Sequence, residues 1–174
     1  MVIDPPWPYE LELDEHGDPI RQVSSYDAEG RRAANQYPEM SIKEIADLHI
    51  PAQDDSVMWL WTTHRFMRDS FQLLEDWGFE YKVMLVWDKQ KMGMGHWLRL
   101  QCEFCLLAIK GNPVWENTHV RDILSVPRRE HSRKPDEFFE MVDKVCQGAK
   151  LDYFSREKRP GWDQIGNDVD KFYK

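Results

Sequence analysis

Apolar residues along this chain gather into short continuous runs, and polar or amphipathic segments separate the runs. Continuous runs of about four to eight apolar residues, rich in β-branched and aromatic side chains, are typical of strands buried on both faces. We predict strands over residues 2–3, 56–61, 79–87, 103–113, 119–126 and 150–154, the fourth of which ends in a turn.

Helical periodicity occupies three of the segments between these runs. Residues 64–78 place apolar side chains at helical intervals and stop at a glycine that is typical of a helix end. Residues 134–148 carry a proline near the first turn, acidic residues directly after it and a glycine at the exit. Residues 41–48 begin with Ser41 and Glu44, whose spacing is that of a capping box and predicts a short helix.

The alternation of strands and helices predicts an α/β fold, in which a mostly parallel sheet is covered by helices on both faces. The length of 174 residues fits a single domain over residues 1–174. Residues 10–36 are polar and follow no steady period. A loop of this length inside a compact domain is usually functional or disordered, so we expect a mobile loop there.

Charge and composition narrow the classes of function. The formal net charge of −8 argues against a generally basic nucleic-acid-binding protein, although it leaves room for a locally positive surface. No apolar run approaches the roughly 18 residues of a membrane span, and no signal peptide opens the chain. Three cysteines, an odd number, do not form a disulfide framework. We therefore expect a cytoplasmic protein without a membrane partner.

Cys102 and Cys105 form a C-x-x-C pair within a predicted strand. Their side chains would point to opposite faces of the sheet, and no second cysteine pair completes a zinc set. Buried hydrophobic cysteines are favoured over a metal site, and we expect no metal ligands.

The first candidate for chemistry is the stretch VIDPPWPY over residues 2–9, a strand that ends on a carboxylate, two prolines and an indole. Asp4 and the carbonyl of Pro5 could each accept one N–H of an exocyclic amine on a base, and the prolines would hold that carbonyl in place. Trp7 could stack on the base. The same Asp-Pro-Pro run is also typical of a simple turn that ends a strand.

The second candidate follows the last predicted strand. Arg156, Lys158 and Arg159 come just after this strand and could meet a carboxylate, while Asn167 and Asp168 could bind ribose hydroxyls. No G-x-G-x-x-G and no P-loop motif is present. A charged loop in solvent explains these residues equally well on their own.

Five motifs in one order carry a family resemblance over almost the whole chain. They are DPPW at 4–7, YPEMS at 37–41, GHWLRLQCEFCLLAIKGNP at 95–113, SRKPDE at 132–137 and the end FSR…W…IGND. Together they resemble the N6-adenine methyltransferases with a D-P-P-W motif. That family includes the catalytic subunit of the eukaryotic mRNA adenosine methyltransferase and bacterial and phage DNA enzymes. The resemblance implies a Rossmann-like methyltransferase sheet, the permuted motif order of the β group, and S-adenosylmethionine as cofactor.

The resemblance also implies roles for particular residues. The catalytic pocket would consist of Asp4, Pro5, Pro6 and Trp7. Tyr37 would help to close over the target base, and Lys134 would lie beside both the entering base and the methionine end of the cofactor. Asp4 would also face the cofactor's amino group. The remaining cofactor contacts would come from Phe154, Ser155, Arg156, Asn167 and Asp168.

Two departures from the family pattern stand out. Only Met1, Val2 and Ile3 precede the D-P-P-W motif, so the predicted first strand is short, and Asp168 stands where the family often has glutamine or glutamate. We expect a nucleic-acid partner, with DNA favoured over RNA, and the loop at 10–36 as a target-binding element. RNA as target, a non-catalytic nucleic-acid-binding subunit and methylation of another amine remain alternatives, and a homo-oligomer and a hetero-oligomer are both open.

Overall fold

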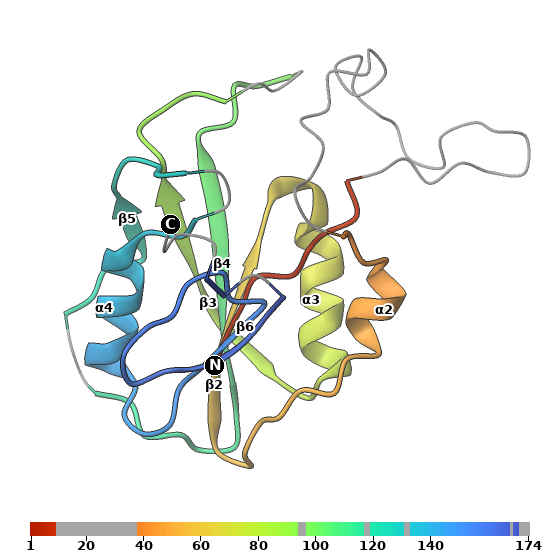
Figure 1. Cartoon of the computed structure of the whole chain (residues 1–174), viewed down its shortest axis with the longest axis vertical. Coiled ribbons are helices and arrows are strands. Elements are labelled where there is room, and N and C mark those ends of the chain that lie inside the picture. Colours follow the sequence, from red (N-terminus) through yellow and green to blue (C-terminus); the bar gives the residue numbers. More distant parts are fainter. Residues whose placement is uncertain (10–37, 94–96, 117–118, 131–132, 168, 171–174) are drawn as a thin grey trace, which may run out of the picture.

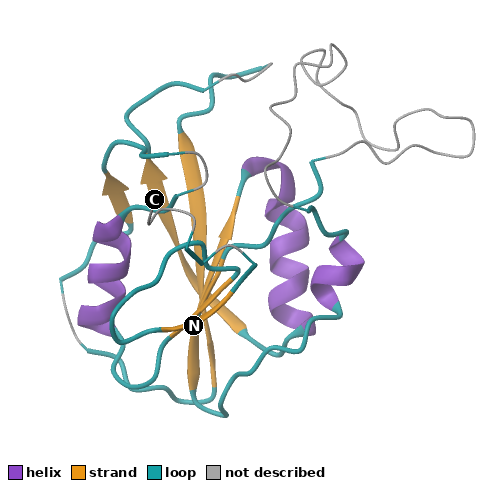
Figure 2. Cartoon of the chain, in the orientation of Figure 1, coloured by secondary structure: helices purple, strands orange, loops and turns teal. Residues whose placement is uncertain are grey.

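The computed structural model describes residues 1–9, 38–93, 97–116, 119–130, 133–167 and 169–170. Their strands form one seven-stranded sheet in the order β5-β3-β4-β2-β1-β6-β7 (Figures 1 and 2). The strands are β1 Val2–Ile3, β2 Ser56–Thr62, β3 Glu80–Asp88, β4 Cys102–Lys110, β5 Ile123–Ser125, β6 Leu151–Tyr153 and β7 Asp163–Ile165. The described helices are α2 Ile42–Ala46, the 3-10 turn η1 His64–Phe66, α3 Met67–Asp76 and α4 Asp136–Val145.

The predicted α/β class is confirmed, with one strand reversed. The pairs β1·β2, β1·β6, β6·β7 and β3·β5 are parallel, whereas β4 runs antiparallel to both β2 and β3. The chain passes from β3 to β4 through residues 89–101 without a described helix, and a parallel return would need a crossover connection. The amino end of β4 therefore lies at the same sheet edge as the carboxyl ends of the other strands.

Alternation along β2 explains why its sequence reads as a continuous apolar run. Val57, Trp59 and Trp61 contribute to the core cluster under α4, and Met58 and Leu60 contribute to the cluster under α2 and α3. Helices cover both faces, as Figure 1 shows, so each position of the strand meets an apolar layer. This double burial was predicted from the sequence and is confirmed.

The predicted helix ends agree with the local geometry. The Ser41 side chain accepts a hydrogen bond from the backbone N–H of Glu44, and the Glu44 carboxylate accepts one from the backbone N–H of Ser41 at 2.7 Å. Gly78 follows the end of α3 with φ +75°, a conformation that favours glycine. Helix α4 is shorter than the predicted 134–148, because Pro135 stands at its N-cap and Cys146 already has extended backbone.

The short strand β1 lies at the centre of the sheet. Val2 pairs with Trp59 of β2 on one side and with Asp152 of β6 on the other, and both residues of β1 are buried. The amino group of Met1 donates to the Val57 carbonyl at 2.8 Å, which extends the contact with β2 by one residue. Two residues thus suffice to place the D-P-P-W motif where the carboxyl ends of β1, β2 and β6 meet.

Strand β7 was not predicted. Its three residues, Asp163 to Ile165, include two polar side chains and give no apolar run. The strand exists because β6 offers it a parallel edge, with Tyr153 opposite Ile165. Pairing with a neighbour, which a local sequence pattern does not contain, produces this element.

Candidate active site

A cavity of about 430 Å³ opens at the carboxyl edge of the sheet. Its walls come from the ends of β1, β2 and β3, from the start of β4 and from the segment before α4. The lining residues are Asp4, Pro5, Trp7, Tyr9, Thr62, Thr63, Trp87, Lys89, Glu103, Arg128, Arg129, Glu130, Arg133 and Lys134. This is the position that parallel α/β sheets use for ligands.

Asp4, Lys134 and Glu103 form the polar centre of this cavity. The Lys134 Nζ donates to Asp4 Oδ2 at 2.8 Å and lies 3.9 Å from Glu103 Oε1. The same ammonium lies 5.1 Å from the centre of the Trp61 ring. Burial alone would lower the pKa of Lys134, but the Asp4 and Glu103 carboxylates outweigh it and raise the pKa above its ordinary value. Lys134 is therefore a buried cation held by two carboxylates.

Trp7 is packed more firmly than the sequence indicates. Its indole N–H donates to the Trp61 carbonyl at 3.2 Å, and its ring stacks on Phe66 with centres 5.1 Å apart and planes 9° apart. It still lines the large cavity. The role of Trp7 as a stacking platform for a base stays a prediction.

The two prolines hold their carbonyls in defined places. The Pro5 carbonyl accepts a hydrogen bond from the Trp7 N–H at 2.8 Å, and the Pro6 carbonyl accepts one from the Met40 N–H at 2.9 Å. A carbonyl oxygen has two lone pairs, so Pro5 keeps one for a further donor. Asp4 and Pro5, consecutive residues after β1, thus each carry an acceptor.

A second, small cavity of about 40 Å³ adjoins the first and shares Asp4, Arg133 and Lys134 with it. It also contains three residues that the family resemblance assigned to the cofactor, Phe154, Ser155 and Arg156. Its other lining residues are Val2, Phe139, Asp152, Glu157 and Arg159. The residues attributed to two different ligands therefore meet at one wall.

The turn after β6 shapes the small cavity. Phe154 has φ +68°, an uncommon conformation for a residue with a side chain. The buried Ser155 donates its backbone N–H to the Ile165 carbonyl at 3.0 Å. A Cβ on Gly166 would lie 2.1 Å from the Ser155 carbonyl oxygen, so this close approach requires glycine. Local strain and a tight contact with the β7 end thus fix the turn.

Asp152 is a buried carboxyl group in the small cavity that the sequence analysis did not single out. It is 7% exposed, and burial raises its pKa to about 7, although Ser155 and Arg159 oppose the shift. It lies on β6 opposite Val2 of β1, and Val2 is two residues before Asp4 along the chain. Two carboxyl groups therefore flank the central strand.

Among the described residues, two members of the predicted site line neither cavity. Pro6 is buried, and Asn167 is exposed. Tyr37 and Asp168 lie outside the described residues, as does the predicted loop at 10–36. The roles of these four residues stay predictions.

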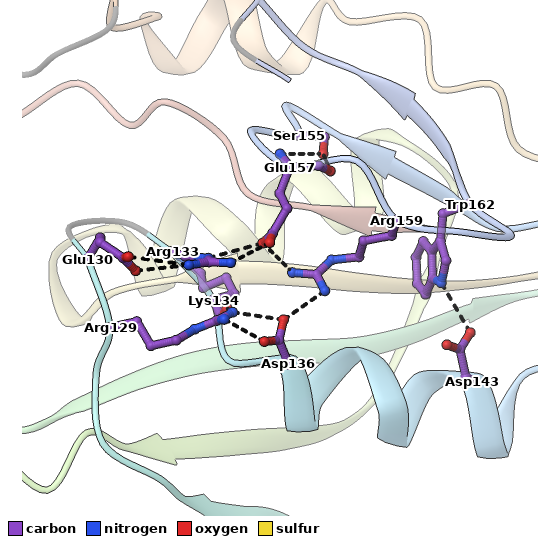
Figure 3. Close-up of polar contacts among 10 residues, drawn as sticks. All are labelled: Arg129, Glu130, Arg133, Lys134, Asp136, Asp143, Ser155, Glu157, Arg159 and Trp162. Carbon is purple, nitrogen blue, oxygen red and sulfur yellow. Dashed lines mark hydrogen bonds and ion pairs between the residues drawn. The ribbon is translucent and has the colours of Figure 1, made fainter. Parts of the chain in front are cut away.

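An ion-pair network connects the segment before α4 with the turn after β6 (Figure 3). Arg129 and Arg159 both bind Asp136, the first residue of α4. Arg159 and Arg133 both bind the Glu157 carboxylate, and Arg133 also reaches Glu130. The guanidinium groups of Arg129, Arg133 and Arg159 are thus bound by carboxylates of the protein itself.

The side chains around the small cavity suit the groups of S-adenosylmethionine. Asp4 and Asp152 can accept from an ammonium or from hydroxyls, the guanidinium groups can bind a carboxylate, and Phe139 and Phe154 offer apolar contact. The cavity volume, however, is well below the roughly 300–1,000 Å³ of sites that bind such ligands. The chemistry fits, and side chains in the wall must move to admit the cofactor.

Comparisons with known proteins agree with this geometry. The family described as MT-A70 matches residues 1–168. The chain is 33% identical over 178 residues to the Type II methyltransferase M.MunI of Mycoplasma sp. This match covers 97% of this chain and 76% of the relative. The chain is also 30% identical over 183 residues to the N(6)-adenosine-methyltransferase catalytic subunit METTL3 of Homo sapiens. That match covers 98% of this chain and 28% of the relative.

A plant relative gives the same result. The chain is 30% identical over 181 residues to the probable N(6)-adenosine-methyltransferase MT-A70-like of Oryza sativa subsp. japonica, with 97% of this chain and 22% of the relative covered. The chain thus spans about three quarters of the Mycoplasma relative and about a quarter of the other two. The motifs, the sheet and the cavity at its carboxyl edge agree with these matches, and the chain belongs to the MT-A70 family of N6-adenine methyltransferases.

Proposed function

We propose that this chain transfers a methyl group from S-adenosylmethionine to the exocyclic N6 amine of adenine in nucleic acid, with DNA as the favoured target. One observation carries the proposal: Asp4 and Pro5 both line the large cavity, and Asp4 also lines the small one. The target adenine would enter the large cavity and the cofactor the small one. A base inside a duplex must first leave its stack to reach such a site.

The proposed mechanism assigns a task to each acceptor. S-adenosylmethionine supplies an electrophilic methyl group. Asp4 Oδ1 and the Pro5 carbonyl each accept a hydrogen bond from one N–H group of the amine. These two hydrogen bonds draw the nitrogen toward tetrahedral geometry and direct its lone pair at the methyl group. Lys134 binds Asp4 Oδ2 and so fixes the carboxylate before the base arrives. The Asp4 carboxylate can then take the proton that the methylated amine loses.

The preference for DNA rests on similarity to the Mycoplasma relative. This relative is named a Type II methyltransferase and is 33% identical to the chain, whereas the two relatives named for adenosine are each 30% identical. We therefore place DNA before RNA as the target.

The cytoplasm is the proposed compartment, because all three cysteines are free thiols and such thiols suit a reducing environment. Within the described residues, no helix is long and apolar enough to cross a membrane. The proposed partner is nucleic acid alone or together with a second protein chain.

Nucleoside mass spectrometry tests the proposal directly. The chain is incubated with S-adenosylmethionine and either DNA or RNA oligonucleotides, and N6-methyladenine is quantified after digestion. We expect methylation of DNA that falls by about 10³-fold or more in Asp4→Asn, because the amide has one acceptor oxygen, whereas the carboxylate offers Oδ1 to the amine and Oδ2 to Lys134. Asp47→Asn, a change in an exposed ion pair of α2, serves as the matched control and should keep full activity.

The other outcomes of this experiment discriminate between the alternatives. Full activity in Asp4→Asn contradicts the mechanism. Methylation of RNA alone reverses the target preference. Cofactor binding without methylation of either nucleic acid favours a non-catalytic subunit, and methylation at another amine favours a different acceptor.

A further inference from the structure

The carboxylate of Glu157 lies between two guanidinium groups in the wall of the small cavity (Figure 3). Its Oε1 accepts from Arg133 Nη2, and its Oε2 accepts from Arg133 Nε at 3.1 Å and from Arg159 Nη2 at 2.8 Å. The Glu157 side chain is 16% exposed and those of Arg133 and Arg159 are 18% and 14% exposed. Arg133 and Arg159 thus form a binding site for a carboxylate, and the carboxylate of Glu157 occupies it.

The two arginines are held in place independently of Glu157. Arg133 also binds Glu130, and Arg159 binds Asp136 Oδ1 at 2.8 Å with its guanidinium carbon 3.6 Å from the centre of the Phe139 ring. The buried Nε of Arg159 has no hydrogen-bond acceptor among the described residues. The pair of guanidinium groups would thus keep its position, with donors available, when another carboxylate takes the place of Glu157.

Arg133 lines both cavities, and this places the carboxylate site at their junction. A methyl group transferred to a base in the large cavity must lie at that junction as well. In S-adenosylmethionine, the carboxylate lies only a few bonds from the sulfur that carries the methyl. The amino-acid portion of a correctly placed cofactor therefore reaches the region that Glu157 occupies.

We propose that Glu157 is an internal stand-in for the cofactor's carboxylate, and that Arg133 and Arg159 exchange Glu157 for this carboxylate when the cofactor binds. The inference rests on the proposed function, because it assumes S-adenosylmethionine as ligand. Exchange of one carboxylate for another preserves the charge-assisted hydrogen bonds, and the displaced Glu157 side chain frees volume in a cavity of only about 40 Å³. In this exchange, Glu157 competes with the cofactor's carboxylate for the two arginines and so lowers the affinity for the cofactor. The exchange also favours ligands that carry a carboxylate.

Binding calorimetry tests the exchange without catalytic turnover. The ligands are S-adenosylhomocysteine, which keeps the carboxylate but lacks the methyl group, and its decarboxylated analogue, which keeps the amine. In Glu157→Gln, we expect S-adenosylhomocysteine to bind about tenfold more tightly, because a neutral amide competes less well for the two guanidinium groups. The affinity of the decarboxylated analogue should change by less than about twofold.

Two further variants separate exchange from general charge effects. Glu130→Gln removes a carboxylate from the same Arg133, but Glu130 does not line the small cavity. It should change the affinity for S-adenosylhomocysteine by less than about twofold. Arg133→Gln should weaken binding of S-adenosylhomocysteine about tenfold and leave the decarboxylated analogue unaffected. Thermal unfolding of each variant confirms that it is folded at the titration temperature.

The outcomes distinguish the inference from the function on which it rests. Unchanged or weaker binding of S-adenosylhomocysteine to folded Glu157→Gln contradicts the exchange and makes Glu157 a scaffold for its arginines. Equal tightening by Glu130→Gln, or equal tightening of both ligands, also contradicts it. If Glu157→Gln fails to fold, the Arg133→Gln result decides alone. If the wild-type chain binds neither ligand, with or without an oligonucleotide, the proposed function itself is wrong.

Discussion

Lys134 has two roles at the scale of a single residue, because it neutralises Asp4 and Glu103 and also orients Asp4. In Lys134→Gln, the two carboxylates face each other without a cation, so we expect the free energy of unfolding to fall by about 1–3 kcal/mol. The loss is below that of a fully buried pair because both carboxylates keep some contact with solvent. We also expect the single-turnover methylation rate at saturating cofactor to fall by about 100-fold.

Urea unfolding and single-turnover kinetics measure these two effects separately. Lys43→Gln is the matched control, because Lys43 forms an exposed i,i+4 pair with Asp47 and its loss should leave the free energy of unfolding unchanged. A Lys134→Gln variant that turns over at the wild-type rate would show that Asp4 needs no partner to hold its position.

Asp152 connects the cavity to the pH dependence of stability. Its folded pKa is raised to about 7, above the ordinary value of 3.8, so the folded state binds more protons than the unfolded state between these two values. Stability from this group is therefore fully present below about pH 4 and is lost as pH rises toward 7. The full loss is on the order of 4 kcal/mol.

Asp152→Asn should remove this contribution to the pH dependence. Between pH 4.5 and 8, we expect the free energy of unfolding to fall less in the variant than in the wild type. The two changes should differ by about 1–3 kcal/mol, as measured by urea denaturation. Asp163→Asn on the neighbouring strand is an exposed control and should leave the wild-type profile unchanged. Parallel profiles for wild type and Asp152→Asn would mean that Asp152 titrates as an ordinary carboxyl.

Several residues that the sequence motifs assigned to a site line the two cavities. Asp4, Pro5 and Trp7 lie on one wall, and Lys134, Phe154 and Arg156 lie near them, as their motifs implied. Glu103 and Asp152 were missed because each lies within an apolar strand, and a strand's sequence does not tell which neighbour or which edge its polar residue faces. Asn167 shows the opposite case, since its motif is present but its side chain is exposed and away from both cavities.

At the scale of elements, the sequence likewise predicted what residue type shows and missed what depends on a neighbouring strand. The apolar runs predicted β2, β3 and β6, and in β2 burial on both faces explains the continuous run. The antiparallel direction of β4 and the existence of β7 depend on long-range pairing, which a local pattern does not encode. The predicted helices were correct in place, and their ends shifted by a few residues, as is usual for helix boundaries.

The N-terminus of α4 provides a test of the ion-pair network. Asp136 begins this helix and binds both Arg129 and Arg159, so it supports the helix dipole and connects two loops. We expect Asp136→Asn to lower the free energy of unfolding by about 1–2 kcal/mol, discounted for a side chain that is 47% exposed. Glu137→Gln, in the same first turn and exposed, should cost less than about 0.5 kcal/mol.

The pH dependence of this difference has a defined sign. Burial opposes the shift, but hydrogen bonds from Arg159 and Arg129 lower the pKa of Asp136 below its ordinary value. Its contribution to stability is thus present above about pH 4 and is lost as pH falls through the lowered pKa. Urea denaturation should show a smaller difference between the two chains at pH 3 than at pH 7, and a difference of the same size at both values would point to packing rather than charge.

At the scale of the whole molecule, the proposed function requires an acidic protein to bind an acidic polymer. The formal net charge is −8, yet the large cavity carries five basic side chains: Lys89, Arg128, Arg129, Arg133 and Lys134. Carboxylates bind the last three of them. Lys89 and Arg128 form no ion pair with a described residue, and they lie side by side because the Arg128 N–H donates to the Lys89 carbonyl at 3.3 Å. Positive charge available to phosphate is thus concentrated at one rim of the cavity.

This concentration predicts how binding responds to salt. Each phosphate contact adds about 0.9 to the slope of log affinity against log salt for duplex DNA and about 0.7 for a single strand. Lys89→Gln and Arg128→Gln should each weaken oligonucleotide binding at low salt and reduce the slope by about one, as measured by fluorescence anisotropy between roughly 50 and 200 mM salt. Lys82→Gln, near the start of β3 and hence at the opposite sheet edge, removes the same charge and should leave the slope unchanged.

If all three variants weaken binding equally, net charge rather than the cavity rim governs the encounter. A loss confined to Lys89 and Arg128 means that the backbone of the target strand passes the entrance through which the adenine must enter.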